Sequence, residues 1–308
     1  MTIPIPKFKL NNGVEIPAIG LGGWAGLTEE EHTAAGKTWM LTAIKNGYRH
    51  IDTAQGYGTE PAVADAIKLS GVPREEIFIT TKLPWNHPNR VQESFEESLK
   101  NIQTDYVDLY LVHWPFTVRY DPNNDTPRNA QGDLDVVDKP DFNDTWAEVE
   151  KIYASGRAKA IGVSNFSIKN LEKLFQTAKV VPAVNQVELH PYLAQPELKK
   201  YCDDKGILLT AYTPTGYSTV RSDPTITSLA QKYNVTPAQI ILSWHVARGV
   251  AAVPKSSNPE HQKHNLELVK LSEEDLAKIN ALDRGERLCN KPNERGVVWG
   301  WTMEQLGW

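Results

Sequence analysis

Four residues of the 308-residue chain carry side chains suited to proton transfer, and each stands at or just behind the end of a short apolar run. Asp52 and Lys82 each end such a run, Tyr57 lies in the loop after Asp52, and His113 ends the run Leu-Tyr-Leu-Val-His. A tyrosine, with a pKa of about 10, is a poor proton donor unless a neighbouring ammonium lowers that pKa. A carboxylate can hold the ammonium, and a neutral histidine can donate a hydrogen bond to a carbonyl oxygen. The set therefore predicts protonation of the alkoxide that forms when a carbonyl is reduced.

Each of the four residues alone has a plain structural explanation. An aspartate after a strand is commonly a helix cap, a lysine is usually solvated, and a single histidine is usually a satisfied core residue. Only their joint placement at strand ends favours chemistry, so the elements that carry them decide the interpretation. Active sites of parallel α/β barrels lie at the carboxyl ends of the strands, where these four side chains would converge.

The chain alternates short apolar runs with amphipathic stretches, which predicts parallel strands buried on both faces and separated by helices. The expected strands are Pro17–Gly20, His50–Asp52, Ile77–Thr81, Val107–Leu111, Ala160–Ser164, Val184–Glu188, Leu208–Tyr212 and Ala251–Pro254. Helical patterns cover Arg90–Ile102, Thr145–Tyr153, Ile168–Thr177, Glu197–Lys205 and Thr236–Arg248. This α/β pattern predicts either a (β/α)8 TIM barrel or a doubly wound sheet.

Segments outside the alternation mark the ends and one side of the predicted domain. Asn12-Gly13 in the segment 8–16 indicates a β-hairpin that closes the bottom of a barrel. The barrel is expected over 17–266, with a C-terminal helix and an irregular tail over 267–308, all in one domain over 1–308. The polar stretch 117–141 is long for a connector and follows the fourth strand, which places it at the catalytic mouth. The tail 284–308 contains three tryptophans.

Composition argues against several classes of protein. The net charge is -5 with both signs spread along the chain, so neither nucleic acid nor anionic lipid is expected as a partner. Cys202 and Cys289 are the only cysteines and do not form a ligand pattern, so we expect reduced thiols and no metal. Met1–Leu10 lacks the apolar region of a signal peptide, and no stretch is apolar enough to span a bilayer. We expect a cytoplasmic protein, and a monomer because no long exposed apolar stripe is evident.

Several ordered motifs make the chain similar to the aldo-keto reductases. They are Gly-Tyr-Arg-His-Ile-Asp-Thr-Ala with Tyr57 five residues after Asp52, Thr-Lys-Leu, Leu-Val-His-Trp-Pro, Ile-Gly-Val-Ser-Asn-Phe, Asn-Gln-Val-Glu-Leu-His-Pro and Val-Pro-Lys-Ser-Ser-Asn-Pro. The resemblance spans roughly 8–285. Trp-Asn-His (85–87) and Glu-Lys-Ile-Tyr (150–153) look most like fungal glycerol dehydrogenases and glyceraldehyde reductases. The resemblance to the aldo-keto reductases implies a (β/α)8 barrel that reduces small aldehydes or ketones with NADPH. It also implies that Tyr57 is the general acid and Lys82 its partner. Asp52 would anchor Lys82, and His113 would orient the carbonyl.

The resemblance also implies a cofactor site and a substrate pocket. Ser164, Asn165 and Gln186 would hold the nicotinamide carboxamide, and Tyr212 would stack on its ring. The remaining cofactor residues are expected to be Thr213, Pro214, Thr215, Lys255, Ser256, Ser257, Asn258, His261 and Asn265, the last near the adenine. The pocket walls, beside His113, are expected to be Trp24, Trp85, Trp114 and Trp299, although Trp85 could equally be a core residue.

This sequence departs from the family pattern at the cofactor. Gly22-Gly23-Trp24 lacks the usual threonine hydroxyl, the stretch 217–223 is short for a loop that covers the pyrophosphate, and His261 stands where an arginine is expected. Arginine offers a planar fork for adenine and phosphate, whereas neutral histidine offers far less. We therefore expect weaker discrimination against NADH and faster cofactor release.

The sequence is also compared with other classes of nicotinamide-dependent and nicotinamide-binding protein. No Gly-x-Gly-x-x-Gly follows a first strand, which argues against a Rossmann domain. Tyr201 and Lys205 have the spacing of short-chain dehydrogenases but lie in a helical pattern. A non-catalytic NADPH-binding regulatory subunit of the same fold is the main alternative. Reduction of a carbon–carbon double bond goes with glutamate in place of the histidine in related proteins, so His113 favours carbonyl reduction.

Overall fold

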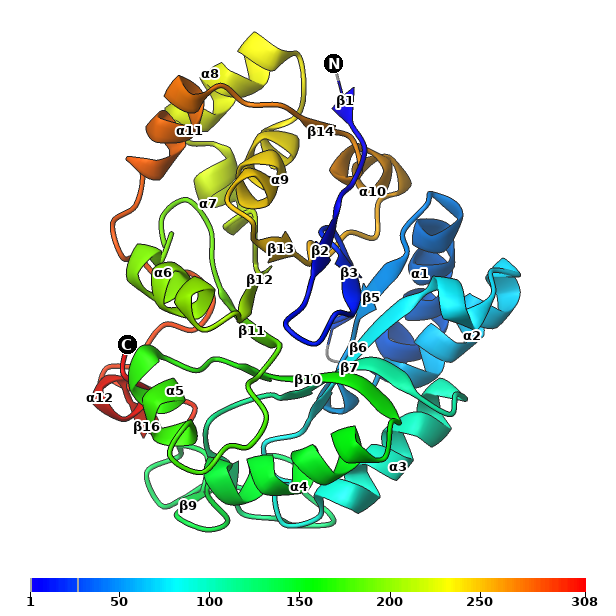
Figure 1. The fold of residues 1–308 in the computed structure, drawn as a ribbon, viewed down its shortest axis with the longest axis vertical. Helices are drawn as coiled ribbons and strands as arrows, with labels where there is room; N and C mark the ends of the chain where they lie inside the picture. The colour runs from blue at the N-terminus through cyan, green and yellow to red at the C-terminus, as the bar shows by residue number, and fades with distance from the viewer. Residues whose placement is uncertain (1, 27) are drawn as a thin grey trace.

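The protein, seen in a computed structural model that describes residues 2–26 and 28–308, is built on a closed barrel of eight parallel strands (Figure 1). Around the barrel these strands are β4 (Leu21–Gly22), β5 (His50–Asp52), β6 (Phe78–Leu83), β7 (Val107–Val112), β10 (Ala158–Ser164), β11 (Val184–Glu188), β12 (Leu208–Tyr212) and β13 (Ala251–Ala252). The last strand returns to the first, because Gly20 N–H donates to Ala252 O at 2.9 Å and Gly22 N–H donates to Pro254 O at 3.1 Å. The (β/α)8 prediction is confirmed, and the doubly wound alternative is wrong.

Helices alternate with the strands and cover the outside of the barrel (Figure 1). They are η1 (Glu31–Ala35), α1 (Gly36–Lys45), η2 (Gln55–Tyr57), α2 (Glu60–Ser70), η3 (Arg74–Glu76), α3 (Val91–Ile102), α4 (Phe142–Ala154), α5 (Ile168–Leu174), α6 (Pro196–Asp204), α7 (Tyr217–Arg221), α8 (Pro224–Tyr233), α9 (Pro237–Ala247), α10 (Pro259–Asn265) and α11 (Glu273–Asn280). The five predicted helices match α3, α4, α5, α6 and α9 to within about a turn. The predicted start at Thr236-Pro237 is a capping box, in which Thr236 and Gln239 bond each other's backbone N–H.

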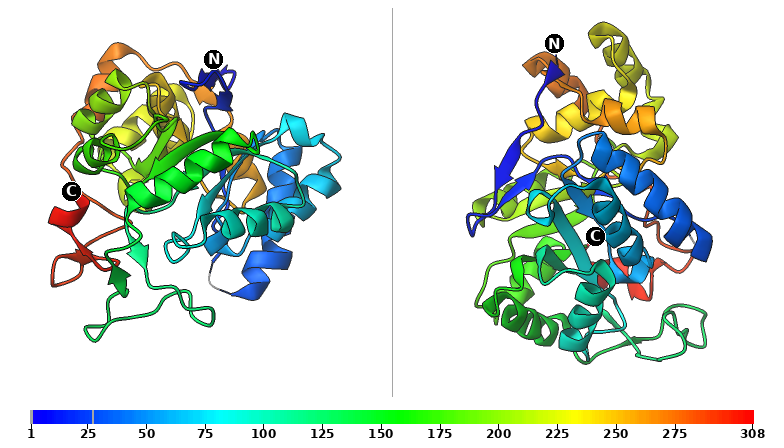
Figure 2. Two further views of the ribbon diagram at one scale, coloured as in Figure 1. Left: turned by 60° about the horizontal axis from the view of Figure 1, so that its bottom comes forward. Right: turned by 90° about the vertical axis from the view of Figure 1, so that its right-hand side faces the viewer.

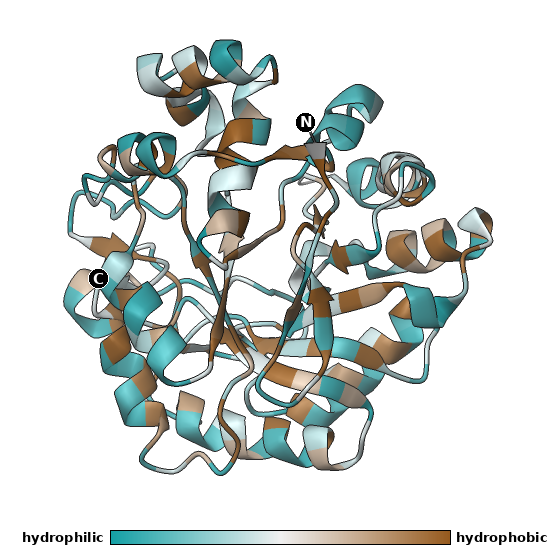
Figure 3. Ribbon diagram, turned by 45° about the horizontal axis from the view of Figure 1, so that its top comes forward, coloured by the Kyte–Doolittle hydropathy of each residue, from teal (hydrophilic) through white to brown (hydrophobic). Residues whose placement is uncertain are grey.

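The main core lies between the strands and the helices. Most strand residues are buried, and the apolar faces of the helices pack on them; in Figure 3 the strands are largely brown, whereas the helices carry both brown and teal segments. This double burial is why the strands are continuous apolar runs rather than alternating ones.

The N-terminal hairpin closes one end of the barrel. Strands β2 (Lys7–Lys9) and β3 (Glu15–Pro17) pair with Phe8 opposite Ile16, which confirms the hairpin one residue beyond its predicted bounds at each end. Leu10 and Ile16 are buried against residues that point into the barrel, among them Leu109 and Leu111. The first barrel strand was predicted at Pro17–Gly20 but is formed by Leu21–Gly22, because Pro17 is used in the hairpin; Ile19 makes only an isolated bridge to Ala252.

Two segments expected to be irregular contain short strands. The segment 117–141 folds back on itself through β8 (Thr117–Val118) and β9 (Val136–Val137). The tail contains β15 (Val297–Val298), β16 (Trp301–Thr302) and α12 (Met303–Leu306), and β14 (Leu268–Val269) pairs with β1 (Thr2–Ile3). In the left panel of Figure 2 the segment 117–141 projects from one end of the barrel with the tail beside it. Asn293 and Arg295 of the tail both bond Asp133, which fixes the two segments together.

Three further observations concern the described residues. No helix among them has the length and apolar character needed to cross a membrane. No group of three or more His, Cys, Asp or Glu side chains is arranged to hold a metal ion in this part of the chain. Cys202 is buried, Cys289 is exposed, and both are free thiols, as predicted.

Candidate active site

The four predicted catalytic residues converge at the carboxyl end of the barrel. Lys82 lies within β6 and is fully buried, and its ammonium donates to Asp52 Oδ1 at 2.6 Å and to Thr53 O at 2.9 Å. The Lys82 Nζ atom lies 4.9 Å from the centre of the Tyr57 ring. Tyr57 and His113 meet edge to face, with ring centroids 5.6 Å apart. Strands β5, β6 and β7 are neighbours in the sheet, so side chains at or just past their ends come together although they are 61 positions apart in sequence.

The protonation states suit an acid rather than a base. Burial raises the pKa of Tyr57 above 10.0, and the Lys82 charge opposes this shift without reversing it. The expected lowering of the tyrosine pKa is therefore wrong for the net shift and right only for the direction in which Lys82 acts. Burial lowers the pKa of Lys82, but Asp52 and Tyr57 outweigh burial and raise it overall. Burial, and then the Lys82 charge, lowers the pKa of His113 well below 6.5, which keeps its imidazole neutral.

The residues expected near the nicotinamide form one hydrogen-bonded group beside the tetrad of catalytic candidates, which is made up of Asp52, Tyr57, Lys82 and His113. Gln186 Nε2 donates to Asp52 Oδ2 at 2.6 Å, and the Ser164 hydroxyl donates to Gln186 O at 2.8 Å. Asn165 Nδ2 donates to His113 O at 3.0 Å, and the Tyr212 hydroxyl donates to Asn165 Oδ1 at 2.7 Å. Asn165 has a positive φ of 66°, a conformation that asparagine adopts more readily than most residues. These four residues therefore brace both Asp52 and the backbone of His113.

The expected nucleotide residues lie on two loops of the same rim. Thr213, Pro214 and Thr215 follow β12, where Thr213 has φ of 49° and His245 Nε2 contacts Pro214 O at 2.9 Å. After β13, the segment 255–258 precedes α10, with Lys255 and Ser257 exposed. The Asn258 side chain caps α10 by accepting from Glu260 N and His261 N.

His261 is exposed on α10, whereas Asn265, on the same helix, is buried beside Tyr48. Asn265 lies one helical turn beyond His261, so the two residues are on neighbouring positions of one face of α10.

The expected tryptophans form most of an aromatic wall. Trp85 and Trp299 lie 5.6 Å apart, and Phe116 stands between Trp85 (6.4 Å) and Trp114 (5.3 Å). Trp85 donates its indole N–H to Asp125 O at 3.0 Å, so it ties the segment 117–141 to the wall and is not simply a core residue. Trp24, 52% exposed after β4, shares no ring contact with them in the structure.

Sequence reasoning missed the residues that attach the tail to the barrel. The buried Glu188 carboxylate, at the end of β11, accepts from the backbone N–H groups of Leu288 (2.5 Å), Cys289 (2.9 Å) and Asn290 (3.2 Å). Burial raises the Glu188 pKa, but hydrogen bonds from His190 and these N–H groups outweigh burial and lower it overall. Phe116, Trp301 and Trp308 complete the aromatic wall, and of these Phe116 and Trp308 were also missed. Their aromatic character in Trp-Pro-Phe and in the tail was the one available signal.

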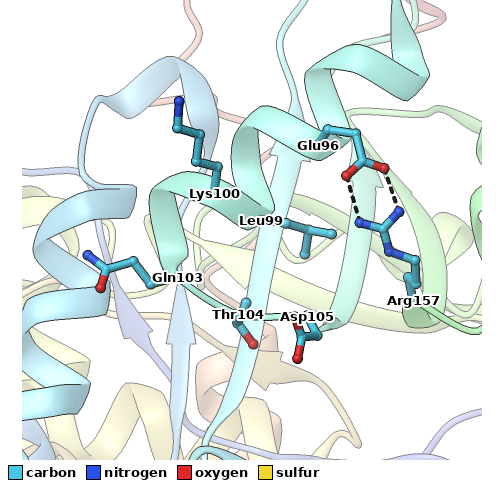
Figure 4. Close-up of a pocket in the computed structure, with 7 residues that line it drawn as sticks. All are labelled: Glu96, Leu99, Lys100, Gln103, Thr104, Asp105 and Arg157. Atoms are coloured by element: carbon cyan, nitrogen blue, oxygen red, sulfur yellow. Dashed lines mark hydrogen bonds and ion pairs between the residues drawn. The ribbon is translucent and has the colours of Figure 1, made fainter.

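A shallow hollow elsewhere carries no comparable chemistry. Its lining residues include Leu99 and Thr104, and a bidentate pair between Arg157 and Glu96 forms one side (Figure 4). It lies where the chain enters β7 and β10, at the opposite end of the barrel from the tetrad.

Comparison with known proteins agrees with this geometry. A family model described as "Aldo/keto reductase family" matches residues 18–284. The chain is 44% identical over 300 residues to glycerol 2-dehydrogenase (NADP(+)) of Saccharomyces cerevisiae, covering 92% of this chain and 94% of the relative. It is 41% identical to glyoxal reductase of Bacillus subtilis (93% and 96% covered) and 41% identical to D-galacturonate reductase of Hypocrea jecorina (95% and 94% covered).

Proposed function

The chain belongs to the aldo/keto reductase family, and on that premise we propose that it reduces small aldehydes or ketones with NADPH, with Tyr57 as the proton donor. The observation that carries the proposal is the convergence of Tyr57, Lys82 and His113 at one mouth, with Lys82 held by buried Asp52. The glycerol, glyoxal and galacturonate of the relatives' names support a small, oxygen-rich carbonyl compound, or the alcohol it yields, as the substrate.

The residues at the mouth fit a nicotinamide nucleotide. Asn165, Gln186 and Ser164 present amide and hydroxyl groups of the kind that pair with a carboxamide, and Tyr212 offers a ring face. Lys255, Ser256 and Asn258 supply the cation and small polar groups that suit the 2′-phosphate. Thr213, Pro214 and Thr215 would follow the pyrophosphate, and His261 would lie near the adenine with Ser257. When bound, the cofactor supplies the hydride.

The protein's own groups then handle the substrate oxygen. His113, neutral because its pKa is low, donates its N–H to the carbonyl oxygen and orients it. Tyr57, protonated because its pKa is high, donates its phenolic proton to the same oxygen as charge develops there. The Lys82 ammonium stabilises the phenolate that remains, and Asp52 with Gln186 holds that ammonium in place. Trp85, Trp114 and Trp299 would form one wall beside the reacting carbon, and Trp24 would form a separate one.

Tyr57→Phe tests the assignment. NADPH oxidation is followed by the nicotinamide absorbance with DL-glyceraldehyde, with a simple aromatic aldehyde, and without substrate as the blank. The rate with an aldehyde should exceed the blank for the wild type but not for the variant. NADPH binding by the variant should stay close to that of the wild type, because the substitution removes one hydroxyl and keeps the ring. Wild-type kcat in the variant would overturn the role of Tyr57, and a wild-type protein that binds NADPH without turnover would overturn the proposed activity.

A further inference from the structure

A directional chain of hydrogen bonds runs from the exposed tail to the backbone of His113. Trp299 Nε1 donates to Asn290 Oδ1 at 3.0 Å, and Asn290 Nδ2 donates to the Tyr212 hydroxyl at 2.6 Å. Tyr212 donates to Asn165 Oδ1 at 2.7 Å, and Asn165 Nδ2 donates to His113 O at 3.0 Å. This series of hydrogen bonds joins Trp299 of the aromatic wall to the proposed nicotinamide platform, which is formed by Tyr212 and Asn165. It ends at His113, the residue proposed to orient the carbonyl.

The direction of this chain is fixed by its two ends. An indole N–H can only donate and a backbone carbonyl can only accept, so each amide and hydroxyl between them has one consistent orientation. Because Asn165 gives its N–H to His113 O, its oxygen faces Tyr212, and the phenol must donate there. The phenol oxygen is then left as an acceptor for Asn290. Burial raises the pKa of Tyr212 well above 10.0, which preserves the phenolic proton that the chain requires.

The tail is built to hold Asn290 and Trp299 in these places. Glu188 fixes the backbone of residues 288–290, and Asn290 is 8% exposed. Trp299 and Gly300 form the two-residue turn between β15 and β16, and Trp299 adopts a positive φ of 54°. Turns of this kind favour Asn or Gly at that position, so a tryptophan there needs compensating contacts. Its bond to Asn290 and its packing on Trp85 are such contacts.

We propose that Asn290 is a positioning residue that couples the tail's substrate wall to the cofactor platform. The inference rests on the proposed function in taking Tyr212 and Asn165 as that platform. Asn290 and Asn165 both bond the phenol oxygen, so together they fix where that oxygen lies and with it the tilt of the Tyr212 side chain. Trp299 bonds Asn290, so a change in the conformation of the tail also changes the position of Tyr212. The affinity for the cofactor and the affinity for the substrate should therefore change together.

Asn290→Ala, Asn290→Leu and Trp299→Phe test the coupling, because leucine keeps the bulk of asparagine and phenylalanine keeps a ring without the N–H. Loss of one such hydrogen bond should weaken NADPH binding by about threefold to tenfold, measured as Kd by fluorescence titration. Both Asn290 variants should show this loss, together with a raised KM for DL-glyceraldehyde. Trp299→Phe should show a smaller increase in Kd that disappears in the Asn290→Ala background, since a double-mutant cycle isolates the shared path.

Asn293→Ala is the matched control, since Asn293 lies on the same tail but bonds Asp133 instead of Tyr212. Its NADPH Kd should stay within about twofold of the wild-type value. Wild-type Kd in Asn290→Leu, equal losses in Asn293→Ala, or multiplicative effects of Asn290→Ala and Trp299→Phe would each overturn the coupling. The proposed function fails separately, if the wild-type protein does not oxidise NADPH with either aldehyde.

Discussion

Replacing Lys82 by methionine should destabilise the protein and abolish activity for two separable reasons. Lys82 is fully buried, and its ammonium is held 2.6 Å from Asp52 Oδ1, while Asp52 Oδ2 accepts from Gln186 at 2.6 Å. Lys82→Met leaves the Asp52 carboxylate buried with one neutral donor and no cation. Breaking one side of a buried pair in this way costs about 3–5 kcal/mol in the free energy of unfolding.

Asp52→Asn in the Lys82→Met background separates stability from catalysis. The double variant has no buried charge at this position, and the oxygen of the introduced amide can still accept from Gln186. Replacing both partners of a buried pair is often nearly neutral, so the double variant should recover to within about 1–2 kcal/mol of the wild type. Its reductase activity should remain at least about 100-fold below wild type, since Tyr57 still lacks the cation that stabilises its phenolate.

Urea unfolding followed by tryptophan fluorescence, together with NADPH oxidation, measures both quantities. Lys200→Met is the matched control, because it makes the same substitution in an exposed pair with Asp204 and should leave the unfolding free energy nearly unchanged. If Lys82→Met costs no more than Lys200→Met, or if the double variant is as unstable as the single one, the pair does not carry the buried charge balance described above. If the double variant recovers full activity, Lys82 has no part in proton transfer.

Three further predictions follow from the site. The kcat for reduction should be flat from about pH 6.5 to 9 and fall only above about pH 10, because the pKa of Tyr57 is raised and that of His113 lowered; a break near neutral pH in rapid-mixing assays would contradict this. Glu188→Gln should weaken tail docking by about 1.5–3 kcal/mol, measured by limited proteolysis; since the Glu188 pKa is lowered in the folded state, its contribution is complete above the ordinary value of 4.5 and is lost as the pH falls through the folded-state pKa, so a variant with unchanged acid sensitivity would refute this role of Glu188. The wild-type NADPH/NADH ratio of kcat/KM should stay below about a thousandfold, some 4 kcal/mol, and His261→Arg should raise it by about tenfold or more; an unchanged ratio would remove His261 from the nucleotide site.

The barrel and the positions of the four candidate catalytic residues were predictable from sequence because their signals are local. Strands buried on both faces are short apolar runs, and a residue at the end of such a run must lie at one mouth of a parallel barrel. Asp52 and His113 are placed in this way by β5 and β7. The first strand was misplaced because Leu21–Gly22 is two residues long and glycine-rich, so its position is set by hydrogen bonds to the chain near Ala252 rather than by its own pattern.

The tail contacts could not be predicted, because no local pattern encodes them. Glu188 binds backbone groups about 100 positions later, and a backbone N–H is the same whatever side chain accompanies it. Asn290 bonds Tyr212 across 78 positions, and a single asparagine in a polar stretch is ordinarily a turn or surface residue. Conversely, Thr236-Pro237 was readable because a helix cap is completed within four residues.

The balance of burial and charge around Tyr57 favours a resting state in which its phenol is protonated. Burial keeps the phenol protonated, so the proton is present before the substrate arrives, and the opposing Lys82 charge is ready to stabilise the phenolate once that proton leaves. If Lys82 dominated, the resting tyrosine would be a phenolate, suited to accept a proton from an alcohol rather than to donate one to a carbonyl. Asp52 tempers the ammonium by pairing with it directly, and Gln186 holds Asp52 in that pairing. How readily Tyr57 gives up its proton therefore depends on how firmly Asp52 is held, which makes Gln186 and the group bonded to it part of the acid–base chemistry.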